Sequence, residues 1–340
     1  MQSTATVSLP AWRRWLARYG ALAGGGLLVA IGIIIAYVYN PIVTTAVLSS
    51  TVRQSTPLVL GAMCGLIGER SGIINIGIEG QMLMAAFMGF LFNVWTGNLL
   101  LAVLAGAATG ALLGLLLAFM SVTLKIDQII GGTVINILAL GLTGYFYTQG
   151  LVTQGKLTPI TIPVLSKIPL VGPVLFDNPP ITYTTIILVF LVNYVLFHTR
   201  WGLRSRSVGE HPRAADTLGV NVYRTQYINV MIGGAIAGLA GAFLTLEAVG
   251  SFERGMTNGR GFVALAVMIF GNWTPLGSWG AALLFGFATA MQTQLQFGGQ
   301  LNIPHQFIGM LPYLLTIVVL AGFGGRARPP AAEGVPYEKE

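Results

Sequence analysis

The stretch WGLRSRSVGEHPRAADTLGVNVYRTQ, residues 201–226, is the one long polar interruption in a chain that is otherwise mostly apolar. It is dense in arginine, with a further arginine directly before it: Arg200, Arg204, Arg206, Arg213 and Arg224. Pro212 suits the first turn of a helix, Ala214 and Ala215 are good helix formers, and Gly219 suits a left-handed cap. We therefore predict a helix of about two turns that faces the cytoplasm between two membrane spans. Because so short a helix is unstable alone, we expect Ala214 and Ala215 to offer a small face to a partner. A solvated loop that only sets the topology is the alternative.

The composition is that of an integral membrane protein. Of the 340 residues only 9% are charged and 54% are hydrophobic, with a mean hydropathy of +0.75, whereas a soluble domain carries about 25% charged residues. The net charge of +7 would suggest nucleic acid in a soluble protein, but arginines that flank apolar runs follow the positive-inside rule, and we predict no nucleic-acid partner. The single cysteine, Cys64, excludes an intrachain disulfide. The histidines are scattered and no catalytic constellation stands out, so we predict neither a metal site nor an enzyme.

The apolar runs predict an all-α, polytopic transmembrane bundle of about ten membrane segments, some of them short or broken. We expect a cytoplasmic N-terminal segment at 1–20, a transmembrane domain at 21–325 and a cytoplasmic tail at 326–340. Within the domain, 150–180 is the expected external loop and 200–227 the expected cytoplasmic loop. Glycines at four-residue spacings predict close contact between helices: Gly106, Gly110, Gly114, Gly233, Gly234, Gly238 and Gly241.

The distribution of positive charge supports this layout. Thirteen of the 18 Lys and Arg residues fall inside, as the positive-inside rule requires. The remaining five fall outside: Arg53, Lys156, Lys167, Arg254 and Arg260. Both termini are therefore expected in the cytoplasm.

Polar residues at membrane depth are costly, so we expect them to face the interior of the bundle or a wet cavity. The predicted solute path consists of six such residues: Asn75, Glu79, Gln81, Asn136, Gln292 and Gln296. For any single one of them, a hydrogen bond between helices is the simpler interpretation. As a set they are mostly amides, which favours a neutral, hydrogen-bonding solute. Polar breaks at 68–80 and 271–277 fit a binding region made of interrupted helices.

Residues 150–157, GLVTQGKL, match a phosphate-binding loop until the last position. Leu157 stands where a Ser or Thr would be needed to bind magnesium. We therefore predict no bound cofactor on this chain. If transport is driven by ATP, then ATP and Mg²⁺ belong to a separate ATPase chain.

Three stretches resemble the permease subunits of bacterial ABC importers, in the family that holds branched-chain amino acid, simple sugar and nucleoside permeases. They are GERSGIINIGIEGQMLMAAFMG at 68–89, GLRSRSVGEHPRAADTLGV at 202–220 and FVALAVMIFGNWTPLG at 262–277. The ending MLPYLLTIVVLAGFGGRARPP at 310–330 is similar to the nucleoside branch. The resemblance implies a type II importer fold in the bacterial inner (cytoplasmic) membrane. It also implies a second permease chain, in a heterodimer, an ABC ATPase and an external solute-binding lipoprotein.

The same resemblance gives the short polar helix a role. It implies that the segment is the coupling helix that docks on the ATPase, formed by Gly209, Glu210, His211, Pro212, Arg213, Ala214, Ala215 and Gly219. Relatives commonly have asparagine at the position of His211, which leaves the role of this histidine open.

The expected function is therefore import of a small neutral solute, with a nucleoside favoured. A carboxylate-bearing amino acid would need an arginine or a helix N-terminus, and the polar residues at membrane depth offer mainly amides. A simple sugar such as ribose fits the amides almost as well. The alternatives from other classes are a secondary transporter driven by an ion gradient and a membrane-embedded enzyme.

Overall fold

The computed structural model describes residues 28–297 and 328–339, with five single residues between them: Phe307, Gly309, Met310, Leu314 and Ile317. The predicted segment 1–20 and most of the last apolar run lie outside the described residues.

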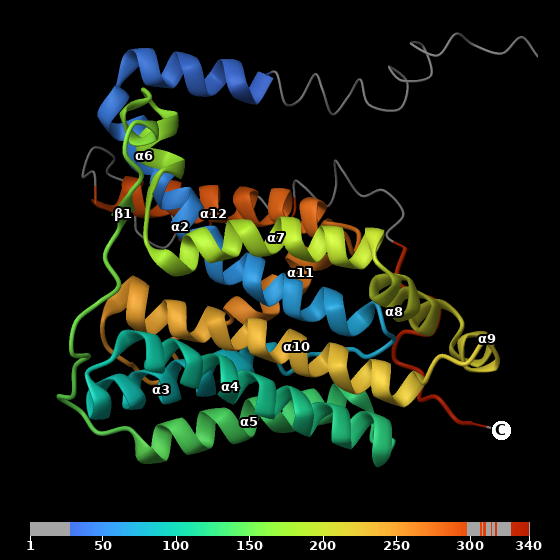
Figure 1. The fold of residues 1–340 in the computed structure, drawn as a ribbon. Coiled ribbons are helices and arrows are strands. Elements are labelled where there is room, and N and C mark those ends of the chain that lie inside the picture. Colours follow the sequence, from blue (N-terminus) through green and yellow to red (C-terminus); the bar gives the residue numbers. More distant parts are fainter. Residues whose placement is uncertain are drawn as a thin grey trace, which may run out of the picture.

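The described chain is built almost entirely of helices (Figure 1). A short helix, Leu28–Tyr39, precedes the main series. That series is α2 (Pro41–Glu69), α3 (Ile78–Thr96), α4 (Leu99–Ala118), α5 (Gln128–Phe146), α6 (Val171–Leu175), α7 (Pro180–His198), α8 (Arg200–Glu210), α9 (Pro212–Thr217), α10 (Val222–Ala242), α11 (Arg260–Phe270) and α12 (Pro275–Phe297). The π-helical stretches η1 (Phe119–Thr123) and η3 (Phe243–Val249) extend α4 and α10. Strands β1 (Ile160–Thr161) and β2 (Asp177–Asn178) pair antiparallel, with Ile160 opposite Asn178, on either side of the 3-10 turn η2 (Leu165–Lys167) and α6.

Short polar side chains define where the helices begin. The side-chain oxygens of Asn40, Asn98, Asp127 and Asn221 accept hydrogen bonds from backbone N–H groups in the first turns of α2, α4, α5 and α10. Each such bond satisfies a donor that the helix itself leaves unpaired. Helix α2 continues through Pro57 without ending there.

Helix α10 lies at the centre of the bundle, and glycines allow its neighbours to approach. A Cβ atom at Gly110 of α4 would lie 2.1 Å from the carbonyl oxygen of Gly234 on α10. On two other sides of α10, a Cβ at Gly233 would lie 2.8 Å from the Cys64 oxygen of α2, and one at Gly241 would lie 2.3 Å from the Met82 oxygen of α3. The close packing predicted from the glycine spacing is therefore confirmed.

The two predicted breaks are also confirmed. Residues 70–77 are not helical and separate α2 from α3, and residues 271–274 separate α11 from α12. Arg70 and Trp273 join the two breaks, because the Arg70 guanidinium donates to the Trp273 carbonyl at 2.7 and 3.0 Å. The Trp273 indole in turn donates to the Glu69 carboxylate at 2.5 Å.

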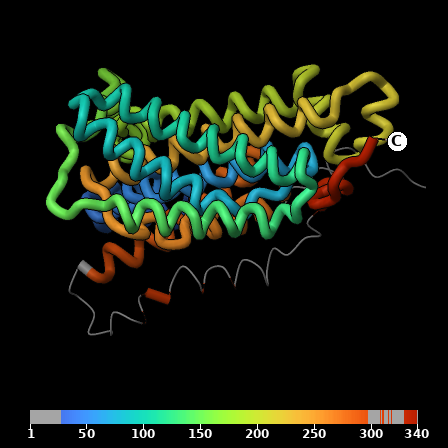
Figure 2. Tube along the Cα trace, turned by 90° about the horizontal axis from the view of Figure 1, so that it is seen from below, coloured from blue at the N-terminus to red at the C-terminus, as the bar shows by residue number. Residues whose placement is uncertain are grey.

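The long helices run in roughly the same direction, and the loops gather at two opposite ends (Figures 1 and 2). Helices α8 and α9 lie at one end with the C-terminal tail, and β1 and α6 lie at the other. Among the described residues, five helices are long and apolar enough to cross a membrane, the ones containing α3, α4, α5, α7 and α10. The prediction of an all-α, polytopic membrane fold is confirmed.

Candidate functional site

The predicted short helix is present as α9, at the end of the bundle that also holds the tail. Pro212 occupies its first turn, and Gly219, just beyond its end, has a φ of +82°. Helix α8 was not predicted. Its start is marked by Thr199, whose hydroxyl accepts from the Gly202 N–H at 3.2 Å. Gly209 lies inside α8, where a Cβ would come within 2.4 Å of the Arg70 carbonyl oxygen. This glycine therefore lets α8 touch the segment that follows α2.

The two faces of α9 differ. Ala215 is only 3% exposed and packs with Val208, Val222 and Tyr337 of this same chain. The expectation that Ala215 presents its methyl group to a partner is therefore wrong, because this side of α9 faces the tail and the start of α10. The exposed residues here are Arg213, Ala214 and Thr217 of α9 and Leu218, which follows it. Leu218 is 85% exposed, which leaves a large apolar side chain in solvent at the tip of the bundle.

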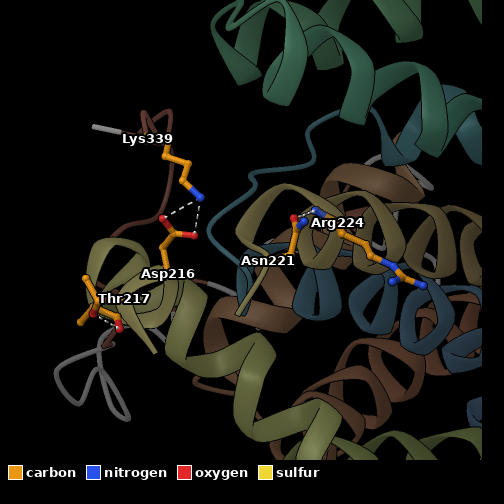
Figure 3. A network of polar contacts seen from close by, with 6 residues as sticks. Asp216, Thr217, Asn221, Arg224 and Lys339 are labelled. Carbon is orange, nitrogen blue, oxygen red and sulfur yellow. Dashed lines mark hydrogen bonds and ion pairs between the residues drawn. The ribbon is translucent and has the colours of Figure 1, made fainter. Parts of the chain in front are cut away.

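Polar contacts hold the surroundings of α9 in place. The Glu210 carboxylate accepts from the Ala331 N–H at 3.2 Å, and Asp216 forms an ion pair with Lys339 at 3.4 Å (Figure 3). The Asn221 side chain caps α10 by accepting from the Arg224 N–H at 2.9 Å (Figure 3). His211, at the junction of α8 and α9, is exposed.

Two of the predicted path residues lie deep in the packed bundle. Asn75 and Gln81 are at most 1% exposed, and the Asn75 amide donates to the Gln81 oxygen at 3.1 Å and to the Cys64 sulfur at 3.3 Å. These contacts join the 70–77 segment to α2 and α3. In this structure both residues therefore form hydrogen bonds that link neighbouring segments, which is the simpler of the two interpretations given for them above.

Two further predicted path residues, Glu79 and Asn136, hold the start of α3. The Glu79 carboxylate accepts from the N–H groups of Gly259 and Gly261 at 2.8 and 2.6 Å, so it caps the N-terminus of α11. The Asn136 side chain of α5 accepts from the Gly80 N–H at 2.7 Å and donates to the Ile76 carbonyl at 3.1 Å. Two discontinuous helices, α3 and α11, therefore begin side by side, with a carboxylate between them.

Gln292 and Gln296 are half-buried on α12 and stand apart from these contacts. The structure therefore brings together four of the six predicted path residues, around the first turn of α3, and separates them from the two glutamines of α12.

A cavity of about 740 Å³ lies at the end of the bundle opposite α9. It is lined by parts of α2, η3 and the 253–260 segment, and none of the six predicted path residues is among its lining residues. Its charged lining residues are Arg53, Lys156, Glu247, Glu253, Arg254 and Arg260. Four of these six residues are Lys or Arg side chains that were expected outside the membrane. This group of external positive charges is the feature of the sequence that could have indicated the cavity. Its wall includes Asn258 and Arg260, directly beside the α11 N-terminus that Glu79 caps.

Glu247 is 5% exposed at this cavity, and its carboxylate also caps a helix. It accepts from the N–H groups of Ile181 and Thr182 at 2.8 and 3.2 Å and from the Thr182 hydroxyl at 2.5 Å. These bonds fasten η3 to the start of α7. A buried carboxylate with three donors is a fixed structural group. Two of the cations are also bonded within the chain, Lys156 to the Ala248 carbonyl at 2.8 Å and Arg260 to the Met256 carbonyl at 2.9 Å.

Three arginines line the cavity, Arg53, Arg254 and Arg260. An arginine is a partner that a carboxylate-bearing solute would need, whereas the six predicted path residues, which lie outside the lining of this cavity, are mainly amides.

An all-α, multi-pass membrane bundle with a charged cavity at one end and a short helix at the other fits a membrane transport permease, and the comparisons with known proteins show the class. The chain belongs to the family described as branched-chain amino acid transport system / permease component, whose model matches residues 47–320. It is a transport subunit and not an enzyme.

Several curated relatives are similar over nearly their whole length. The guanosine ABC transporter permease protein NupQ of Bacillus subtilis is 41% identical, over 87% of this chain and 98% of that protein. The nucleoside ABC transporter permease protein NupC of Lactococcus lactis is 40% identical, over 86% and 96%. The putative glucose ABC transporter permease protein TsgC13 of Haloferax volcanii is 36% identical, over 81% and 90%. The first two organisms each hold a second, more distant relative, NupP at 28% over 81% of each chain and NupB at 24% over 93% of each chain. No solved structure matches the chain.

Proposed function

We propose that this chain is the membrane-spanning subunit of an ATP-driven ABC importer that carries nucleosides across the cytoplasmic membrane. The observation that carries the proposal is the similarity to a guanosine permease and a nucleoside permease, which spans 98% and 96% of those proteins. The expected alternative of an ion-coupled secondary transporter is set aside, because the chain belongs to a family of ABC transporter permeases.

The proposed orientation places α9 and the tail in the cytoplasm and the charged cavity outside. It is supported by the position of the arginine-rich α8 and α9 at one end of the bundle. In this orientation the exposed face of α9 meets an ABC ATPase, which binds ATP and Mg²⁺ itself, and the cavity opens toward an external solute-binding lipoprotein. Relatives occur as pairs, NupQ with NupP and NupC with NupB, which supports a second, non-identical permease chain.

The proposed solute path begins in the external cavity and continues toward the neighbouring starts of α3 and α11. Discontinuous helices are typical of transporter binding regions, because their ends supply unpaired backbone groups where a solute must be bound and released. In the structure, however, the N–H groups at the start of α11 are already bonded to the Glu79 carboxylate. Arginine side chains of the cavity donate to carbonyl oxygens and ring nitrogens, which a nucleobase offers.

A sugar is the second candidate substrate, and one observation favours it. The relative named as a putative glucose permease is 36% identical over 90% of its length, not far below the nucleoside relatives. Hydroxyl groups of a sugar accept from arginines as readily as base carbonyls do.

The test is uptake by proteoliposomes that hold both permease chains and the ATPase, with the binding lipoprotein outside and ATP inside. Labelled guanosine, adenosine, glucose and leucine are compared. We expect nucleoside uptake that depends on ATP, that Arg260→Gln at the cavity reduces, and that Lys167→Gln on the 150–180 loop leaves unchanged. Leucine uptake without nucleoside uptake would contradict the proposal, and glucose uptake alone would assign the chain to the sugar transporters.

A further inference from the structure

The C-terminal tail, residues 328–339, is a non-helical segment with a turn at 331–334 that crosses the α9 end of the bundle and touches several elements in sequence. Its backbone N–H groups are bonded to three other elements of the chain. The Arg328 N–H donates to the Asn272 side chain at 3.0 Å, the Ala332 N–H to the Gly209 carbonyl at 2.9 Å, and the Gly334 N–H to the Gly72 carbonyl at 3.1 Å. The tail is therefore bonded to the α11–α12 break, to α8 and to the 70–77 segment.

Tyr337 anchors the far part of the tail. Its side chain is 8% exposed and fills the cluster that contains Ala215, the one described residue of α9 that is buried. Its ring also lies 5.4 Å from the ring of Tyr223 at the start of α10. Helix α9 contributes only Ala215 to this apolar cluster. The other buried members, Tyr337, Val208 and Val222, belong to the tail, α8 and α10.

Two ion pairs hold the end of the tail. Lys339 pairs with Asp216 of α9 at 3.4 Å (Figure 3). Glu338 pairs with Lys125, in the turn before α5, at 2.7 Å. Both pairs are largely exposed, and such pairs add little stability. Their value is geometric, because they place the tail between α9 and the loop that precedes α5.

A helix of six residues cannot keep its own position. Helix α9 is joined to α8 through His211 and to α10 through residues 218–221, and the tail adds a third connection, directly to the breaks between the membrane helices. We propose that residues 328–339 form a coupling strap: the tail passes a displacement of α9 to the 70–77 segment and the α11–α12 break, and Tyr337 is its positioning residue. This inference rests on the proposed function, because it assumes that a partner ATPase moves α9.

The strap explains why the α9–tail contact is apolar at its centre. When a helix is displaced, side chains that pack firmly against it move with it. Exposed ion pairs break and re-form with water, so they transmit little of the displacement. Removal of the Tyr337 ring should therefore leave α9 present and able to dock, but should disconnect its motion from the membrane helices.

The experiment uses the full complex in proteoliposomes with Tyr337→Ala, with the conservative Tyr337→Phe, and with Val335→Ala as the matched control, since Val335 lies on the same tail but is exposed. The readout is uptake per ATP hydrolysed, measured with whichever of guanosine or glucose the wild type transports. We expect this ratio to fall about fivefold or more in Tyr337→Ala, to be restored by Tyr337→Phe, and to be unchanged in Val335→Ala. A chain truncated after Pro336 should reproduce the loss.

A second measurement separates this inference from the proposed function. Amide hydrogen exchange of the isolated permease needs no solute, and we expect Tyr337→Ala to speed exchange in both α9 and the 70–77 segment, while Val335→Ala does neither. If the wild type transports no nucleoside, the proposed function fails and this comparison still decides the strap. An unchanged uptake ratio in both Tyr337→Ala and the truncated chain would overturn the strap. Faster exchange in α9 alone would also overturn it. So would a loss of assembled complex with no change in uptake per ATP hydrolysed, since either result shows that the tail has only a structural role.

Discussion

The contact between α4 and α10 allows a graded prediction, because one helix face carries three glycines at different distances from its neighbour. A Cβ atom would meet its nearest neighbour at 2.1 Å at Gly110, at 2.6 Å at Gly114 and at 3.2 Å at Gly106, whereas ordinary contact begins at 3.4 Å. At Gly110 and Gly114 the neighbour is a carbonyl oxygen of α10. Backbone cannot rotate away as a side chain can, so the helices themselves must separate.

The expected cost follows from these distances. Alanine falls short of ordinary contact by 1.3 Å at Gly110, by 0.8 Å at Gly114 and by 0.2 Å at Gly106. Overpacking typically costs about 1–3 kcal/mol, and we expect Gly110→Ala at the upper end of this range. Part of the cost is offset, because alanine is favoured over glycine in a helix by about 1 kcal/mol. Gly106→Ala should therefore be close to neutral.

Gly141→Ala is the matched control, since a Cβ at this position of α5 would have nothing within 4 Å. The assay is the midpoint of thermal unfolding of the purified permease in detergent, followed by the fraction that stays monodisperse. We expect the order of stability to be Gly141→Ala, Gly106→Ala, Gly114→Ala and Gly110→Ala, from highest to lowest. If Gly110→Ala unfolds at the same temperature as Gly141→Ala, then α4 and α10 are not in backbone contact and the central packing described above is wrong.

Three further predictions concern single side chains. Glu79→Gln should destabilise the permease by about 1–3 kcal/mol in the same thermal assay, since α11 loses a carboxylate cap, while the exposed Glu253→Gln should not. Leu218→Ser should weaken binding of the ATPase by about tenfold, the loss expected when one buried leucine is removed from an interface, and an unchanged dissociation constant would exclude this residue from the docking face. Burial raises the pKa of Glu333 in the docked tail above its usual value of 4.5. Docking is therefore favoured by protonation, fully below about pH 4.5 and progressively less as pH rises through the raised pKa. A spin label on the tail should become more mobile with rising pH, and less steeply so in Glu333→Gln, although Glu69 on α2 also faces this carboxyl.

Local features of the fold could be read from the sequence because each depends on residues close together in the chain. Caps such as Asn98 and Asp127 act within three residues, and Pro212 and Gly219 bracket a helix of six residues. The spacing of glycines on α4 and α10 indicates close contact without stating the partner, since any smooth helix face satisfies the same pattern.

The polar contacts could not be predicted, because their partners are far apart in sequence. Glu79 was recognised as a costly polar residue at membrane depth, but its hydrogen-bond donors are backbone N–H groups about 180 residues away in the sequence. The outward face of α9 was misjudged at Ala215 for the same reason, since the tail residue that covers it, Tyr337, lies over 100 residues further on. A run of alternating small residues indicates that one side of a helix is packed, and only the tertiary structure shows against what.

The cavity and α9 lie at opposite ends of the bundle, yet a continuous series of contacts joins them. Gly209 of α8 and Gly72 are both bonded to the tail, and the segment after Gly72 leads directly into the first turn of α3. There the Glu79 carboxylate holds the α11 N-terminus, whose residue Arg260 lines the cavity. The hydrogen bonds in this series all go to or from backbone groups at a break or near an end of a helix, where φ and ψ can change without unpacking the glycine-rich centre. An alternating-access movement needs such deformable places beside a rigid core, since packed helices shift as units and only their junctions absorb the difference. Under the proposed function, the rigid α4–α10 contact and the bonded breaks are complementary parts of one mechanism, and a variant that loosens the first should lower stability before it alters coupling.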